Sequence, residues 1–273
     1  MQPGGNVLNE GKRNLLGIMI DAVDYEAAVA FVFRCAREKR AATISALAVH
    51  GIMTGVLNPE HKFRLNGFDL LVPDGQPVRW MMNWIHETNL CERVYGPELM
   101  QRICDRAANE GTPIYLYGST QAVVTSLALS LTKKFPGINI VGCEPSAFRK
   151  LSVNEKTALQ QRIQSSGACI VFAGLGCPRQ EIFAYELRNN ISAPILAVGA
   201  AFPLLAGTLP QAPPWMQRFG LEWLFRLCAE PLRLWRRYLL LNPAYLVLVA
   251  LQRIGLRHFS SQGRPPAEDV LVG

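Results

Sequence analysis

Short apolar runs alternate with longer amphipathic stretches over most of this chain. Apolar runs of this length predict buried strands, and the intervening stretches carry apolar residues at helical spacing. The predicted strands are 14–20, 42–50, 68–75, 112–120, 138–145, 168–174 and 193–202. The predicted helices are 24–40, 97–110, 121–135 and 154–167. Because strands alternate with helices, we expect residues 1–205 to form an α/β domain, a parallel sheet with helices on both faces.

The pattern then changes, since Pro, Trp and Arg become frequent and every predicted element is a helix. Residues 206–258 hold seven arginines, two glutamates and no lysine, which places a net +5 of the chain's +7 charge here. The longest apolar run, 238–251, is broken by Asn242-Pro243 and is shorter than the roughly 20 residues of a spanning helix. We therefore predict a basic, membrane-associating helical appendage without a transmembrane helix, and a disordered tail at 259–273.

The composition narrows the class of protein and its surroundings. With 49% hydrophobic and 18% charged residues, the chain is not disordered. Its positive balance predicts an anionic partner, which is a nucleic acid, a phosphorylated ligand or an acidic lipid surface. The N-terminal residues lack the apolar stretch of a signal peptide, and the seven cysteines are scattered without CxxC pairs. We therefore expect a chain that works in the reducing cytoplasm.

Candidate ligand-binding residues stand where predicted strands end. Open parallel sheets bind ligands at the carboxyl ends of their strands. Asp74 lies at such an end, within Pro-Asp-Gly, and is either an ordinary turn residue or a general base that faces a cleft. Polar residues or glycines occupy four such ends, at 45–50, 73–76, 118–120 and 174–180.

Two of these ends carry glycines. Gly174 and Gly176 would let a ligand approach the backbone, and the helix that follows favours a phosphate at its N-terminus. Gly118 and Ser119 precede another predicted helix. They either contact a nucleotide, or Ser119 or Thr120 simply caps that helix. For the loop of Gly174 and Gly176, the alternative is an ordinary tight turn from strand to helix.

Motifs that would specify a particular chemistry are absent from the sequence. There is no GxGxxG, no P-loop and no DxD pair of carboxylates for a metal-bound sugar diphosphate. His50, His61 and His86 lack HxxxH or HExxH spacing. We therefore predict no metal site and no cofactor, and expect arginines and backbone amides to neutralise any diphosphate.

The arginines of the appendage are interleaved with aromatic residues and leucines. Arg226, Arg233 and Arg237 would share one helix face, with Arg236 close by, if a single helix ran through Pro231. Such a face suits an interfacial helix on anionic lipid. It also suits a solvated basic face above a core stripe, and the same arginines can reach a diphosphate.

Several motifs together are similar to one known family. They are GLGCPRQE at 174–181, VGAAF at 198–202, GLEWLFRLCAEPLRLWRRY at 220–238, VPDG at 72–75 and RVYGPEL at 93–99. The chain thereby resembles the WecG/TagA/CpsF family, glycosyltransferase family 26, from about residue 14 to 250. The resemblance implies an inverting, metal-independent enzyme with a Rossmann-like core and a C-terminal helical appendage. Its substrates would be a UDP-sugar and a polyprenyl-diphosphate-linked saccharide, met peripherally on an anionic membrane surface at the inner face of the cell membrane.

The resemblance also implies roles for individual residues. The family's proposed base falls on Asp74, its active-site hydroxyl on Ser45 and its loop glutamine on Gln180. Glycine-loop and strand-end contacts would come from Gly118, Ser119, Gly174 and Gly176. The arginines that would close over the cleft and hold the diphosphate fall on Arg226, Arg233 and Arg236.

The sequence departs from the family at three places, one of them Gln211, where many members have arginine. Leu47 stands where many members have asparagine, and Pro203 where many have aspartate. The donor sugar therefore stays open between N-acetylmannosamine, glucose and similar hexoses, for exopolysaccharide or another cell-surface polysaccharide. Two other functions remain open: a nucleic-acid-binding protein that uses the basic appendage, and an inactive scaffold that has lost donor binding. Arginines alternating with large apolar residues favour a membrane surface over nucleic acid.

Overall fold

The chain folds around a six-stranded parallel sheet. The computed structural model describes residues 7–268, 270 and 273, with backbone alone at positions 233 and 237. The strands follow the order β4-β3-β8-β7-β5-β6, and every neighbouring pair is parallel. They are β3 (Ala42–Leu47), β4 (Leu70–Pro73), β5 (Ile114–Gly118), β6 (Ile140–Glu144), β7 (Ile170–Gly174) and β8 (Pro194–Ala197). The α/β, Rossmann-like fold expected from the alternation is confirmed.

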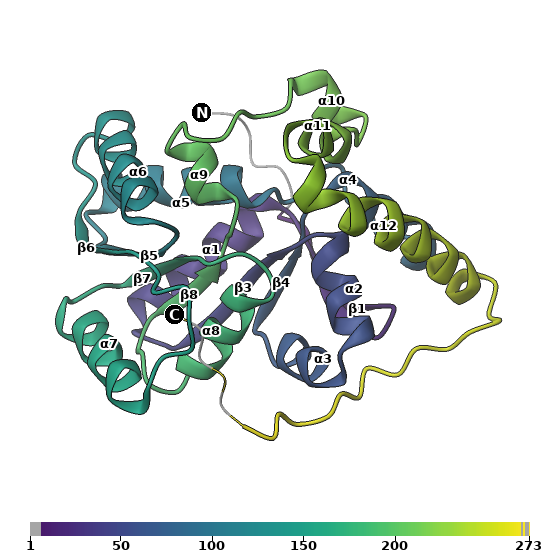
Figure 1. Ribbon diagram of the computed structural model, residues 1–273, viewed down its shortest axis with the longest axis horizontal. Coiled ribbons are helices and arrows are strands. Elements are labelled where there is room, and N and C mark those ends of the chain that lie inside the picture. Colours follow the sequence, from purple (N-terminus) through teal and green to yellow (C-terminus); the bar gives the residue numbers. More distant parts are fainter. Residues whose placement is uncertain (1–6, 269, 271–272) are drawn as a thin grey trace.

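Helices cover both faces of this sheet (Figure 1). Successive strand residues point to opposite faces, so Leu116 joins one buried cluster and Tyr115 the other. The first cluster includes α1 (Tyr25–Arg37), α5 (Gly96–Glu110), α6 (Gln121–Lys134) and α9 (Ala201–Leu205). The second includes α2 (Val49–Leu57), α3 (Pro59–Asn66), α4 (Gln76–His86), α7 (Val153–Ser165) and α8 (Arg179–Leu187). Because all six strands run the same way, their carboxyl ends lie at one edge of the sheet.

Polar residues in the sequence mark where several of these helices begin. The Asp24 carboxylate accepts a 2.8 Å hydrogen bond from the Ala27 amide at the start of α1. Thr120 caps α6, and Ser152 with Glu155 forms a reciprocal capping box at the start of α7. Each satisfies backbone donors that the first helical turn leaves unpaired.

The first predicted strand is wrong in its extent. The apolar run 14–20 contains a turn that joins β1 (Asn9–Leu15) to β2 (Ile18–Val23), and these two strands form a separate antiparallel sheet. Leu16 and Gly17 both have positive φ angles, of 57° and 86°. A two-residue turn of this kind matches the twist of a hairpin. Leucine and isoleucine on both sides of the turn hid it from the hydrophobic pattern.

The appendage consists of α10 (Pro214–Arg218), α11 (Glu222–Ala229) and α12 (Pro231–Arg253). The three arginines would share a face only in one helix through Pro231, and this condition is not met, since α11 ends before that residue and α12 begins with it. Proline suits the first turn of a helix because the amide it lacks has no partner there. Tyr245 and Val249 of α12 are buried in the same cluster as α2, so α12 packs on the α/β body. In the described part of the chain, no helix has the length and apolarity needed to cross a bilayer.

The C-terminal segment follows a defined course over the body, although the sequence predicts a disordered tail from residue 259. It runs as extended chain past the hairpin and α3 (Figure 1). The side-chain amide of Asn66 donates to the Ser261 carbonyl at 2.7 Å, and the Arg264 amide donates to the Pro59 carbonyl at 3.0 Å. These bonds tie a largely exposed segment to the surface of the body.

Candidate active site

A cleft of about 420 Å³ opens at the carboxyl ends of the central strands. Loops after β3, β4, β7 and β8 form its floor, and α11 with α12 forms one wall. This is the edge at which open parallel sheets bind ligands. Lining side chains that could act on a ligand come from both parts of the chain: Asp74, Arg93, Tyr95, Ser119, Gln180, Glu222, Trp223, Arg226 and Tyr238.

Asp74 lies on the floor of this cleft, directly after β4. The backbone amide of Gly96, at the start of α5, donates a hydrogen bond to its carboxylate. Burial raises the pKa of Asp74 to about 6, against the lowering effect of Arg93 and Arg226 and with a smaller raising effect of Glu222. A carboxyl group with this pKa can accept and release a proton near neutral pH.

Glu222 of α11 links the appendage to the cleft floor. Its carboxylate is 2.8 Å from the Arg93 guanidinium and 2.7 Å from that of Arg226. The Tyr95 hydroxyl also donates to it, at 3.1 Å, and the Arg93 guanidinium lies over the Tyr95 ring. The network holds two arginine cations beside Asp74, and the Glu222 carboxylate offsets one of them.

The glycine loop between β7 and α8 is held by its own side chains. The Gln180 carbonyl oxygen accepts from the Gly176 amide at 3.2 Å, and its amide group donates to Glu181 at 2.9 Å. The Ser45 hydroxyl donates to the same Glu181 oxygen at 3.0 Å. Ser45 is fully buried behind the cleft surface, whereas Gly174, Gly176 and Gln180 line it. Ser45 and Gln180 therefore shape the loop in this structure, and their expected contact with substrate stays a prediction.

The structure separates Gly118 from its neighbour Ser119. Gly118 packs on the backbone of Gly174, where an added Cβ would lie only 2.7 Å from the Gly174 carbonyl carbon. Ser119 lines the cleft, and Thr120 rather than Ser119 caps α6. Gly118 thus brings two strand ends together, and Ser119 is the member of this pair that can reach a ligand.

The three predicted arginines differ in position. Arg226 lines the cleft beside Glu222. Arg236 is exposed, and its guanidinium lies 5.2 Å from the centre of the Trp235 ring, outside the residues that line the cleft. The side chain of Arg233 falls outside the described part of the chain, so its predicted role is not tested. The expectation that α12 contributes to the cleft rests on Leu234, Tyr238 and Asn242 instead.

Sequence reasoning missed Arg93, Tyr95 and Glu222. Arg93 and Tyr95 stand in the segment RVYGPEL, which the family resemblance includes, but no local pattern pairs them with a residue of α11. The Val94 amide donates to the Pro73 carbonyl at 2.9 Å, and this bond places both neighbouring side chains beside Asp74. The positions of Arg93 and Tyr95 depend on this contact between distant backbone segments, so they become apparent only in the folded structure.

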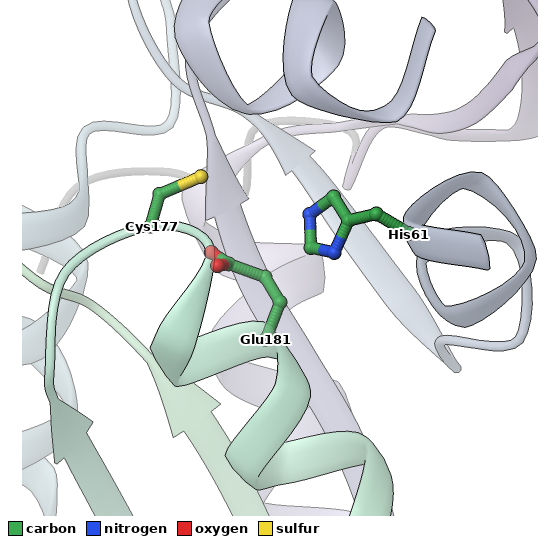
Figure 2. Close-up of side chains that lie close together, drawn as sticks. All are labelled: His61, Cys177 and Glu181. Atoms are coloured by element: carbon green, nitrogen blue, oxygen red, sulfur yellow. The ribbon is translucent and has the colours of Figure 1, made fainter. Parts of the chain in front are cut away.

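One group of potential metal ligands lies beside the cleft, although the sequence predicts no metal site. His61 of α3, Cys177 of the glycine loop and Glu181 of α8 point toward one another (Figure 2). Burial, with a smaller contribution from the cation of Arg64, lowers the pKa of His61 to about 4. Its imidazole is therefore neutral at physiological pH, which is the form that binds metal ions.

The family model of the WecG/TagA/CpsF glycosyl transferases matches residues 13–259 of the 273. The chain belongs to this family. The match includes the sheet, the cleft and all three helices of the appendage. It confirms the family resemblance of the sequence motifs. The residues of the cleft are therefore compared with what glycosyl transfer requires. A glycosyltransferase needs a group that activates the acceptor and a group that stabilises the departing donor, and Asp74 and the arginines stand together in this cleft.

Proposed function

We propose that this protein is an inverting hexosyltransferase that moves a sugar from a UDP-sugar to a polyprenyl-diphosphate-linked saccharide in cell-surface polysaccharide synthesis. The observation that carries the proposal is a carboxyl group at the cleft floor, Asp74, with a pKa near 6 and two arginines beside it. A base with this pKa is ionised at neutral pH and still takes up a proton readily.

The reaction that fits this arrangement is a single displacement. Asp74 takes the proton of the acceptor hydroxyl while that oxygen forms a bond to the anomeric carbon of the donor. The bond from the anomeric carbon to the diphosphate oxygen breaks, and UDP leaves with the electron pair. Attack opposite to the leaving group inverts the anomeric configuration. One carboxylate is enough for this mechanism, because no covalent glycosyl-enzyme forms.

Arg226 and the amides of the glycine loop are the groups that we assign to the departing diphosphate. Arg226 lines the cleft and keeps its charge because it pairs with Glu222. Guanidinium groups and backbone amides stabilise phosphate oxygens through charge-assisted hydrogen bonds. Neutralisation by arginine supports the proposal that transfer itself needs no metal on the diphosphate.

Aromatic rings at the cleft rim can hold the sugar and the uracil base. Trp223 and Tyr238 line the cleft with their ring centres 6.0 Å apart, and both belong to the appendage. Phe148 lines the opposite side and is about half exposed. An exposed aromatic ring in a cleft gains by stacking on a planar base or an apolar sugar face.

We assign the lipid-linked acceptor to the membrane side of α12. Apolar side chains at heptad spacing, Leu232, Leu239 and Leu246, are exposed, with exposures of 92%, 54% and 52%. Leu240, Val247 and Ile254 form a second exposed row beside them. Rows seven residues apart lie on one face of a helix, and an exposed apolar face flanked by arginines suits an anionic bilayer surface.

The decisive experiment incubates the purified chain with a panel of UDP-hexoses and lipid-diphosphate saccharides and identifies the product by mass. We expect one donor and one acceptor to give a product that is larger by a single hexose unit. No product with any pair, together with no calorimetric binding of UDP, would identify the chain as an inactive scaffold.

Flotation with liposomes and a DNA shift assay separate the membrane proposal from the nucleic-acid alternative. We expect the chain to float with vesicles that contain anionic lipid and to leave DNA unshifted at physiological salt. Tight, strongly salt-dependent DNA binding without flotation would indicate instead that the basic appendage binds nucleic acid.

A further inference from the structure

His61, Cys177 and Glu181 bring three different metal-binding atoms together from three separate elements. The ligand atoms all lie within 4.8 Å of one another, and Figure 2 shows the side chains converging on a common point. Imidazole nitrogen, thiolate sulfur and carboxylate oxygen are the three ligand types that Zn²⁺ binds in proteins.

The buried imidazole of His61 is unsatisfied in its hydrogen bonding among the described residues. The residue is only 2% exposed, and neither ring nitrogen has a hydrogen-bond partner in the described part of the chain. A buried ring nitrogen without a partner destabilises the folded state by the cost of its lost hydration. Its ring points at Cys177 and Glu181 (Figure 2). A bound cation would supply the missing partner.

Hydrogen bonds orient the carboxylate of Glu181. Its Oε1 accepts hydrogen bonds from the Ser45 hydroxyl and the Gln180 amide. Its Oε2 is buried, and the carboxylate also accepts a side-chain hydrogen bond from Cys177, whose proton a bound ion would displace. A carboxylate that binds a metal through one oxygen is commonly oriented by hydrogen bonds to the other. Ser45 and Gln180 therefore orient the Glu181 carboxylate through hydrogen bonds, as residues around a metal site orient its ligands.

The charges around the cluster suit a divalent ion. Glu181 and an ionised Cys177 would contribute two negative charges to the ion. The cation of Arg64 lies close enough to His61 to lower its pKa. Binding of the ion releases the thiol proton of Cys177, and no other bond changes. Cys177 and Glu181 also line the cleft, so a water molecule can complete the coordination.

We propose that His61, Cys177 and Glu181 form a Zn²⁺ site that fixes the glycine loop to α3. The loop otherwise depends on the internal hydrogen bonds of Gln180, and the ion adds a link across to a helix on the adjacent wall. The site adjoins the glycine-loop amides assigned to the diphosphate, because Cys177 belongs to that loop, but its ligands are side chains and not those amides. It goes beyond glycosyl transfer, because it assigns a metal to residues whose spacing in the sequence shows none.

The test is a metal titration of the full-length chain after removal of metal by a chelator, with Co²⁺ as the spectroscopic probe and Zn²⁺ as competitor. We expect one equivalent of Co²⁺ to bind with a thiolate-to-cobalt charge-transfer band, which Zn²⁺ then abolishes. Cys177→Ser should lose the band and weaken Zn²⁺ binding at least ~100-fold, and His61→Gln should weaken it similarly. The matched control, Cys91→Ser, removes an exposed thiol and should leave both unchanged.

A second measurement covers the case in which a variant folds poorly. Zn²⁺ should raise the urea midpoint of the wild-type chain and not that of folded Cys177→Ser, because a ligand that binds the native state alone stabilises it. Absence of bound metal in the wild type, or equal binding by Cys177→Ser and the wild type, would overturn the site. These measurements use no sugar substrate, so their failure leaves the proposed transferase function untouched.

Discussion

Asp74 owes its raised pKa to burial, which its arginine neighbours partly oppose. Burial disfavours the charged form, while Arg93 and Arg226 favour it, and Glu222 partly cancels both arginines. The balance leaves the pKa of Asp74 at about 6 instead of its ordinary value of 3.8. A perturbed carboxyl group in a cleft is a frequent mark of a catalytic position. The same arrangement predicts how the rate responds to pH and to mutation.

Replacing Asp74 by asparagine should remove the proton acceptor and keep the shape of the side chain. We expect kcat to fall by about 10²- to 10⁴-fold, the usual contribution of a general base, with UDP binding largely retained. Steady-state kinetics and calorimetry measure the two quantities. Asp105→Asn, an exposed aspartate on α5, is the matched control and should have no effect. Near-normal turnover of Asp74→Asn would refute the assignment.

The activity should rise with pH through the pKa of Asp74. Only the ionised carboxylate accepts a proton, so kcat/KM should be low below about pH 6 and level off above it. A rate profile between acidic and neutral pH gives the midpoint directly. A profile that is flat through this range would show that another group activates the acceptor.

Glu222→Gln should shift that profile. The negative charge of Glu222 raises the pKa of Asp74, and its removal also leaves Arg93 and Arg226 free to favour the Asp74 carboxylate. We therefore expect the acidic limb to move to lower pH, whereas Glu110→Gln at the far end of α5 should leave it in place. A shift to higher pH would contradict this account of the electrostatics.

At the scale of single elements, the meeting of β5 and β7 depends on two glycines. Gly118 has a φ angle of 126° and no room for a Cβ against the Gly174 backbone. Gly111, which ends α5, also has a positive φ angle, of 65°, but faces open space. A comparison of Gly118 with Gly111 therefore shows how much a steric clash adds to the cost of a positive φ angle.

Gly118→Ala should therefore destabilise the protein more than Gly111→Ala. We expect roughly 3 kcal/mol for the first, from strain and overpacking together, and about 1 kcal/mol for the second, from the left-handed backbone alone. Urea unfolding followed by circular dichroism measures both. Equal losses would show that the strand ends can move apart to accept the methyl group.

The sequence predicts most elements because periodicity and capping are local. The capping box of Ser152 and Glu155 and the apolar strand runs lie within a few residues of what they specify. The hairpin turn at Leu16 was missed, since apolar residues continue across it, whereas Pro231 itself marked the possible helix break. The ion pair of Arg93 with Glu222 joins residues that are far apart in the sequence, so no local pattern contains it.

The candidate site was predictable to a similar degree. A strand end predicted that Asp74 faces the cleft, and a family motif predicted the same for Arg226. Both residues line it. Ser45 is fully buried and donates a hydrogen bond to Glu181, whereas its strand neighbours Ala46 and Leu47 line the cleft. A residue's type indicates what it can bind, and only the fold decides which side it faces.

At the scale of the whole molecule, α12 has two different faces. Leu234 and Tyr238 line the cleft, and Leu239 and Leu246 are exposed on another side of the helix. Tyr245 and Val249 anchor its second half in the core. One helix therefore connects the cleft, the buried body and a surface that we assign to the bilayer.

The double variant Leu239→Glu with Leu240→Glu should abolish flotation with anionic vesicles. Carboxylates on this face oppose both burial in the lipid interface and attraction to anionic head groups. Leu129→Glu, at a leucine of α6 that is 69% exposed, is the matched control and should float like the wild type. Activity towards a water-soluble acceptor analogue should survive in both. Unimpaired flotation of the double variant would place the membrane contact elsewhere.

The two-faced helix changes what limits the encounter with an acceptor. A helix is about 10 Å across, so a saccharide anchored in the bilayer has to reach only about that far from the lipid surface to arrive at the cleft. Under the proposed function, the search for this substrate takes place in two dimensions, and the surface density of the lipid, not its bulk concentration, sets how often the cleft fills. In the proposed reaction UDP departs into water while the lengthened glycan stays in the plane of the bilayer, which separates the two products as soon as they form.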